Sequence, residues 1–282
     1  MLDYISNNLN TAQTVLFFCA GWAVGRLIIN VISHMIINAG FLKPNYRGEE
    51  IPVGLGVTIL ISSVTVLALS VIFLSPGVRE KSTVFLFTLA VFTCLGLMDD
   101  FWGDAKCRGL AGHTKSLLSG NPTTGSLKAL VGGMAALYIS AINSSALLLI
   151  PVDAVIIALS VNMINLLDLR PGRAGKGFLF TVILFFIAFP MVQNVLFASM
   201  VAGILLAYLP EDLKSRAMMG DSGANALGSV LGLTAVWIFD LKLKFFYLAV
   251  LVLLHIVAER SSLTRIIASN RLLDYLDRLG RK

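Results

Sequence analysis

The stretch "TVFLFTLAVFTCLGLMDDFWGD", residues 83–104, joins an apolar run to a polar end that holds three carboxylates. The run is typical of a helix buried in lipid, and Asp99, Asp100 and Asp104 follow it directly. One interpretation is that these acidic residues only mark where a helix leaves the membrane. The other is that they belong to a chemical site at the membrane surface.

Composition places the chain among membrane proteins. Its 282 residues are 57% hydrophobic and 13% charged, with a mean hydropathy of +0.84, whereas soluble proteins carry charge on roughly a quarter of their residues. We therefore expect one transmembrane domain over residues 1–258, followed by a cytoplasmic amphipathic tail over 259–282. The first ten residues contain no Lys or Arg and no small-residue cleavage site follows them, so we expect the first helix to be retained.

Nine apolar segments suggest an all-α fold, a polytopic bundle of about nine transmembrane helices. A membrane β-barrel would instead show shorter segments of alternating hydrophobicity. The segments cover residues 11–38, 51–74, 83–98, 127–142, 146–166, 177–190, 193–209, 223–239 and 243–258.

The distribution of basic residues predicts the orientation. With nine spans, one set of links, together with Lys128 at the start of the following helix, holds 17 of the 22 Lys and Arg residues. The positive-inside rule makes that side cytoplasmic and puts the N-terminus outside the cell membrane. The basic residues behind the net charge of +6 are then concentrated on the side where anionic lipid headgroups and nucleotides are met. No nucleic-acid-binding module is apparent in the sequence. No inverted repeat is visible, which argues against a secondary transporter.

Every conspicuous polar stretch falls on the predicted cytoplasmic side, which favours a single active site on that face. Asn162, Asn165 and Asp168 follow one another at steps of three, so they line one end of the fifth predicted helix. Asp221 and Ser222 occupy the expected cap of the eighth, where backbone amides favour anions.

Clustered carboxylates suggest a divalent cation. A carboxylate at the membrane costs roughly 2.5–3.5 kcal/mol near a helix centre, and neighbouring like charges add repulsion that a cation relieves. Oxygen ligands of the Asp and Asn type favour Mg²⁺ or Mn²⁺. Basic residues that suit the accompanying phosphates are Lys43, Arg47, Lys115, Lys128, Arg170 and Arg173.

Four motifs, in order and on one face, resemble those of the polyprenyl-phosphate N-acetylhexosamine-1-phosphate transferases (glycosyltransferase family 4). They are "KPNYRGEEIPVGLG", "MDDFWGD", "NMINLLDLRPG" and "MGDSG". The resemblance implies transfer of a sugar 1-phosphate from a UDP-sugar to the phosphate of a polyprenol such as undecaprenol, with release of UMP.

The same resemblance implies roles for individual residues. Asn165 and Asp221 match metal-binding positions, Asp99 and Asp100 match the pair that orients or deprotonates the lipid phosphate, and Asp168 matches the catalytic nucleotide-sugar side. The expected substrate contacts come from Lys43, Asn45, Arg47, Lys115, Lys128, Asn162, Arg170 and Arg173.

Two departures from the family pattern bear on the donor. Leu169 replaces the usual glycine, and the C-terminal segment lacks the histidine cluster of the bacterial members. A non-catalytic protein that binds polyprenyl phosphate or scaffolds envelope assembly is the alternative, with a transporter a distant third. Whether the chain forms a homodimer stays open.

Two structural expectations follow. The third, fourth, fifth and eighth helices should enclose the site, with Asp100 and Asp221 within about 15 Å of each other if they serve one Mg²⁺ centre. The tail should form a surface helix with Leu272, Leu276 and Leu279 on one side. This helix either anchors to lipid alone or closes the donor pocket through Arg265 or Arg271.

Overall fold

The computed structural model describes residues 2–103, 124–144, 146–189 and 194–281, and almost all of them are helical. The long helices are α1 (Leu2–Asn38), α2 (Val57–Ser70), α3 (Pro76–Trp102), α5 (Thr124–Asn143), α6 (Ile150–Leu167), α7 (Arg173–Ala188), α8 (Val195–Leu213), α9 (Gly220–Ile238) and α10 (Leu241–Arg260). Short elements are the 3₁₀ turns η1 (Val71–Phe73) and η2 (Leu147–Leu149), the strands β1 (Leu42–Pro44) and β2 (Glu50–Pro52), and the tail helices α11 (Leu263–Ser269) and α12 (Arg271–Arg278).

Each predicted apolar segment corresponds to one of the long helices, which confirms the all-α bundle. Within the described residues, six helices are long and apolar enough to cross a membrane: α1, α3, α5, α6, α8 and α10. The other three predicted spans correspond to α2, α7 and α9, so the count of nine crossings stays a prediction.

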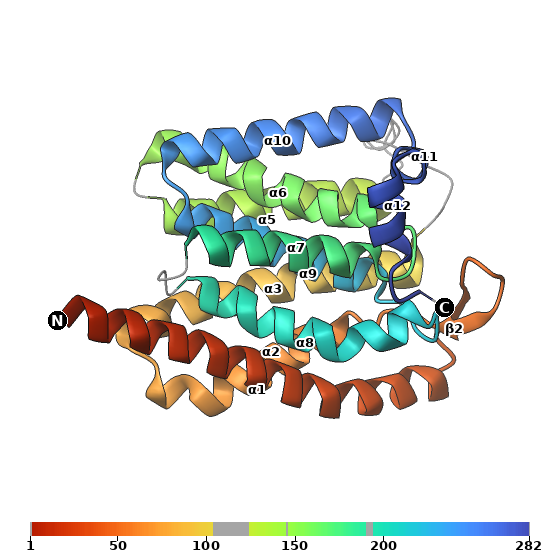
Figure 1. Cartoon of the computed structure of the whole chain (residues 1–282), viewed down its shortest axis with the longest axis horizontal. Helices are drawn as coiled ribbons and strands as arrows, with labels where there is room; N and C mark the ends of the chain where they lie inside the picture. The colour runs from red at the N-terminus through yellow and green to blue at the C-terminus, as the bar shows by residue number, and fades with distance from the viewer. Residues whose placement is uncertain (1, 104–123, 145, 190–193, 282) are drawn as a thin grey trace.

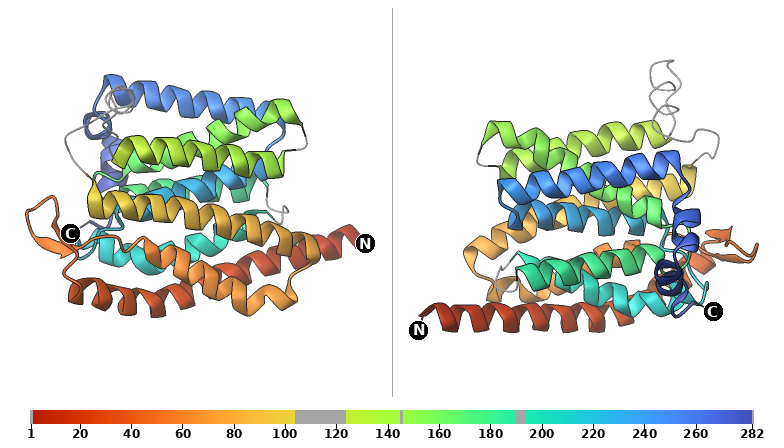
Figure 2. Two further views of the ribbon diagram at one scale, coloured as in Figure 1. Left: turned by 180° about the vertical axis from the view of Figure 1, so that it is seen from behind. Right: turned by 45° about the horizontal axis from the view of Figure 1, so that its top comes forward.

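The long helices lie side by side, and all the motif-bearing segments meet at one end of the bundle (Figures 1 and 2). This end carries the β1–β2 hairpin, the starts of α7 and α9, and the tail helices. The beginning of α1 lies at the opposite end (Figure 1).

Helix α9 lies at the centre and is buried along nearly its whole length, between α3 and α6. Its small residues allow this close packing, as is usual between membrane helices. A Cβ added to Gly96 of α3 would lie 2.3 Å from the backbone oxygen of Asp221. Gly96, directly ahead of the paired aspartates, therefore lets α3 reach the start of α9.

Two local features differ from the sequence predictions. Residues 42–52 form an antiparallel hairpin in which Lys43 pairs with Ile51, where the sequence suggested a loop followed by a helix. Helix α9 starts at Gly220, so Asp221 and Ser222 lie in its first turn, and neither is its N-cap. The amides at this helix start are instead satisfied by a carboxylate from another helix.

Candidate active site

The hairpin brings Lys43 and Asn45 to the end of α3 that carries the paired aspartates. The Lys43 ammonium donates a hydrogen bond to the backbone oxygen of Asp100. The Asn45 oxygen accepts from the amides of Arg47 (2.8 Å) and Glu49 (3.1 Å), and its nitrogen donates to Glu49. Asn45 therefore shapes the hairpin turn, and its buried side chain also lines the pocket described below.

The two adjacent aspartates of α3 point in different directions, because successive helical residues are about 100° apart. Asp100 is only 6% exposed, and its two oxygens accept from the amides of Asp221 (2.8 Å) and Ser222 (3.0 Å). It thus caps α9 from outside the helix, satisfying amides that a helix start leaves free. This contact also places Asp100 and Asp221 well within the separation that a shared site requires.

Asp99 faces α5 and meets Lys128 there. The Lys128 ammonium lies 3.2 Å from an oxygen of Asp99 and 2.6 Å from an oxygen of Asp221. One cation therefore bridges carboxylates from α3 and α9, and all three side chains are partly exposed. These contacts bring three of the candidate site residues, Asp99, Lys128 and Asp221, into one cluster.

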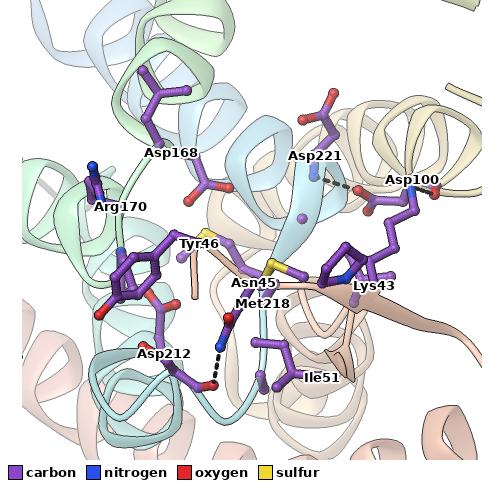
Figure 3. A pocket seen from close by; sticks show the side chains of 18 residues that line it. Lys43, Asn45, Tyr46, Ile51, Asp100, Asp168, Arg170, Asp212, Met218 and Asp221 are labelled. Carbon is purple, nitrogen blue, oxygen red and sulfur yellow. Dashed lines mark hydrogen bonds between the residues drawn. The ribbon is translucent and has the colours of Figure 1, made fainter. Parts of the chain in front are cut away.

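A pocket of about 290 Å³ opens beside this cluster (Figure 3). Its walls come from the hairpin, the end of α3, the α6–α7 loop (168–172) and the segment between α8 and α9. The predicted site residues among its lining are Lys43, Asn45, Asp100, Asp168, Arg170 and Asp221.

Asp168 ends α6 and enters the pocket from the side opposite Lys43 (Figure 3). Burial raises the pKa of this carboxyl well above its ordinary value, and the nearby carboxylates of Asp212, Asp221 and Asp100 raise it further. The protonated form of this carboxyl, which can donate as well as accept a hydrogen bond, is therefore more favoured than in an exposed aspartate.

Asn165 lies outside the pocket lining and contacts a neighbouring helix. Its nitrogen donates to the Asn225 oxygen at 2.6 Å, joining α6 to α9, and its own oxygen is sealed from solvent. Asn162 also lies outside the pocket lining. The metal role of Asn165 and the substrate role of Asn162 remain predictions without support from this geometry.

The three predicted arginines lie at different depths. Arg170 lies in the pocket wall with its guanidinium 5.2 Å from the Tyr46 ring centre, and Arg47 stacks on the same ring at the hairpin. Arg173 is buried and paired with Asp277 of the tail, so it is not free to hold a phosphate. Lys115 lies outside the described residues.

Two pocket residues, Asp212 and Tyr46, and the helix-joining Asn225 had no role predicted from the sequence. Asp212, in the last turn of α8, accepts a hydrogen bond from the Gly172 amide at 2.8 Å and so supports the α6–α7 loop. Tyr46 belongs to the first motif, and Asn225 lies one turn after Asp221. The spacing of Asn225 from Asp221 was a usable signal, whereas the pairings of Asp212 and Tyr46 depend on the tertiary fold.

The described residues offer two carboxylates that could hold Mg²⁺, but no complete set of protein ligands. Among the described residues no three His, Cys, Asp or Glu side chains form a metal-type group. Mg²⁺, however, is commonly held by one or two carboxylates together with substrate phosphates. Asp99 and Asp221 supply two carboxylates that already share one cation, the Lys128 ammonium.

Comparison with known proteins agrees with this geometry. A model of the family described as glycosyl transferase family 4 matches residues 82–239, which is more than half of the chain. The chain belongs to this family. None of the curated proteins compared with the chain matches it.

Membership of glycosyl transferase family 4 identifies the chain in general terms as a membrane-bound phospho-sugar transferase acting on polyprenyl phosphate. The matched region contains Asp99, Lys128, Asp168 and Asp221. The hairpin and the tail lie outside it, although both contact the pocket walls.

Proposed function

We propose that the chain transfers N-acetylhexosamine 1-phosphate from a UDP-sugar to a polyprenyl phosphate such as undecaprenyl phosphate, in cell-envelope glycan synthesis, with Mg²⁺ or Mn²⁺ as cofactor. The observation that carries this proposal is the convergence of Asp99, Lys128 and Asp221 beside a pocket walled by Lys43 and Arg170. Opposed carboxylates next to fixed cations suit the charge of a diphosphate.

In this proposal an oxygen of the acceptor phosphate attacks the sugar-bound phosphorus of the donor. A new phosphorus–oxygen bond forms to the lipid phosphate, the bond to UMP breaks, and UMP leaves with the electron pair. Bound Mg²⁺ would neutralise and orient the diphosphate. Asp99 and Asp221 would hold it, in place of the predicted pair Asn165 and Asp221.

In this proposal, four residues of the chain bind the substrates or position the other site residues. Lys128, released from the carboxylates, contacts phosphate oxygens, and Arg170 contacts the donor from the α6–α7 loop. Asp168 donates or accepts hydrogen bonds on the donor side. Asp100 keeps its amide contacts and holds Asp221 in place, which differs from the direct role that the resemblance implied.

The acceptor tail needs an apolar path that reaches the cytoplasmic end. A groove of about 580 Å³ lies between α6, α7, α9 and α10 and extends from Leu167, the last residue of α6, to Phe239. Its walls include the exposed rings of Phe180 and Phe246. A second groove, against α1, extends along α8 from Val195 to Leu206. It does not reach Leu213, the last residue of α8. We therefore assign the polyprenyl chain to the first groove.

Exchange of labelled UMP into a panel of UDP-sugars, with polyprenyl phosphate present, tests the function. We expect exchange with at least one UDP-N-acetylhexosamine and loss of exchange in excess chelator. Exchange that persists in chelator would refute the metal assignment. A folded protein that exchanges UMP with no donor would support the non-catalytic alternative.

A further inference from the structure

The tail helix α12 is attached to the start of α7 through a buried ion pair. Arg173 donates to both oxygens of Asp277, at 2.8 and 3.0 Å, and to the Thr264 hydroxyl at 3.0 Å. The Arg173 and Asp277 side chains are only 6% and 8% exposed. This two-point geometry is the most directional form of a carboxylate–guanidinium pair.

Two more contacts hold the tail to the same place. Arg281 donates to the Pro171 carbonyl oxygen at 3.1 and 3.2 Å and lies 3.1 Å from an oxygen of Asp277. The Lys176 ammonium donates to the carbonyl oxygens of Leu276 (2.9 Å) and Asp277 (2.7 Å). These residues are about a hundred positions apart in the chain, so the tail crosses the end of the bundle to reach them (Figure 1).

The orientation of α12 shows that polar contacts, and not apolar packing, hold it there. Leu272, Leu276 and Leu279 are exposed, whereas Asp277 faces the protein. A helix packed on a soluble core would do the reverse. The exposed leucines suit the membrane surface, as predicted, and the protein-facing contacts come from Asp277 and Arg281, where the sequence suggested Arg265 or Arg271.

The attached loop forms one wall of the candidate active site. Asp168, Leu169, Arg170 and Pro171 all line the main pocket, while Pro171 and the adjoining Arg173 receive the tail contacts from behind. Gly172 between them has a positive φ of 75°, a conformation that costs other residues energy and needs support from its surroundings.

We propose that Asp277 is a positioning residue: through Arg173 and Arg281 it fixes the α6–α7 loop and thereby the donor side of the pocket. The expected effect on donor kinetics rests on the proposed function. The effect on the position of the α6–α7 loop does not, because it depends on the fold alone. An anchor that only holds the tail to lipid would not need these buried contacts.

The kinetic test compares Asp277→Asn with Asp274→Asn. Both changes remove one charge from α12 one turn apart, but the partner of Asp274, Arg278, is 72% exposed. We expect Asp277→Asn to raise the donor KM about tenfold or more with the acceptor KM nearly unchanged, and Asp274→Asn to behave like the wild type. Asp277→Glu should recover part of the donor affinity. Donor kinetics unchanged in Asp277→Asn would overturn the proposal.

A second readout needs no turnover. A spin label at Leu169→Cys, in a background with Cys19, Cys94 and Cys107 replaced, reports the mobility of the pocket loop. Asp277→Asn and Arg281→Gln should each mobilise the label, and Asp274→Asn should not. A label unaffected by both changes would overturn the positioning role even in a protein that turns over no donor, whereas mobilised labels without turnover would refute the proposed function alone. Arg281→Gln serves if Asp277→Asn does not fold.

Discussion

The neighbouring residues Asp99 and Asp100 have different contact partners and different exposure. Asp99 contacts Lys128 in a partly exposed position, and Asp100 accepts two backbone hydrogen bonds where it is nearly inaccessible. The sequence predicted that both aspartates belong to a site, but not that they divide into one that contacts Lys128 and one that binds backbone amides. It depends on which helices lie on each side of α3.

This division predicts distinct phenotypes for two like substitutions. Asp100→Asn keeps one acceptor oxygen and leaves a buried amide without its partner, so the free energy of unfolding should fall by about 1–3 kcal/mol. Asp99→Asn should leave the melting temperature nearly unchanged and lower transfer about a hundredfold or more. Thermal unfolding and UMP exchange on the same samples measure both effects, and equal losses of stability would contradict the division.

Lys128 leads to a prediction about the metal. Its ammonium shares the Asp99 and Asp221 carboxylates, so it competes with a divalent cation for them. Lys128→Gln should therefore bind Mn²⁺ more tightly while losing most of its activity, because the phosphate contact is lost. Titration of Mn²⁺ followed by EPR measures the affinity. Weaker Mn²⁺ binding in the variant would place the metal elsewhere.

At the element scale, the site depends on how closely α3 approaches α9. Gly96→Ala would push a methyl group into the start of α9, since the new Cβ would lie 2.3 Å from the Asp221 oxygen. We expect a lower melting temperature and reduced activity. Gly133→Ala on α5 is the matched control, because a Cβ there meets nothing within 4 Å, and alanine favours the helix by about 1 kcal/mol. Similar melting temperatures for the two variants would refute the close approach.

The helices could be predicted from sequence because long apolar runs leave few alternatives in lipid. Their connections could not. The hairpin at 42–52 depends on Asn45 bonding to Arg47 and Glu49, and the start of α9 depends on Asp100, which is more than a hundred residues away. In the tail, Asn270 separates α11 from α12 and caps α12, because its side-chain oxygen accepts hydrogen bonds from the amides of Leu272 and Leu273.

In the molecule as a whole, the tail crosses the end of the bundle to contact the pocket loop, and this attachment should depend on pH. Burial alone would raise the pKa of Asp277, but the hydrogen bonds and charges of Arg173 and Arg281 outweigh it and hold the pKa below the ordinary value of 3.8. Among the described residues, the two arginines contact the carboxylate of Asp277 and Lys176 contacts its backbone oxygen. Three further charged residues line the same cavity as Asp277: Arg170, Asp274 and Arg278. A carboxyl group whose pKa is lower in the folded than in the unfolded state stabilises the fold at pH values above its unfolded-state pKa. This contribution is lost as the pH falls through the folded-state pKa.

The stability difference between the wild type and Asp277→Asn should therefore stay constant from pH 8 down to about pH 5 and shrink below about pH 4. Melting temperatures across this range in one detergent measure it. Asp274→Asn, which lacks the buried partner, should show a much smaller difference throughout. A difference that grows as the pH falls would contradict the assigned ion pair.

We propose that Asp99 and Asp221 act in one site that transfers a sugar phosphate to lipid. Purified protein with a radiolabelled UDP-N-acetylhexosamine, undecaprenyl phosphate and Mg²⁺ should form labelled lipid and release UMP in equal amounts. Asp99→Asn and Asp221→Asn should each reduce the rate about a hundredfold or more, and the double variant should be little worse than either, since residues that act as a unit are not additive. Rates close to the wild type in both folded single variants, or losses that multiply in the double variant, would contradict a shared site.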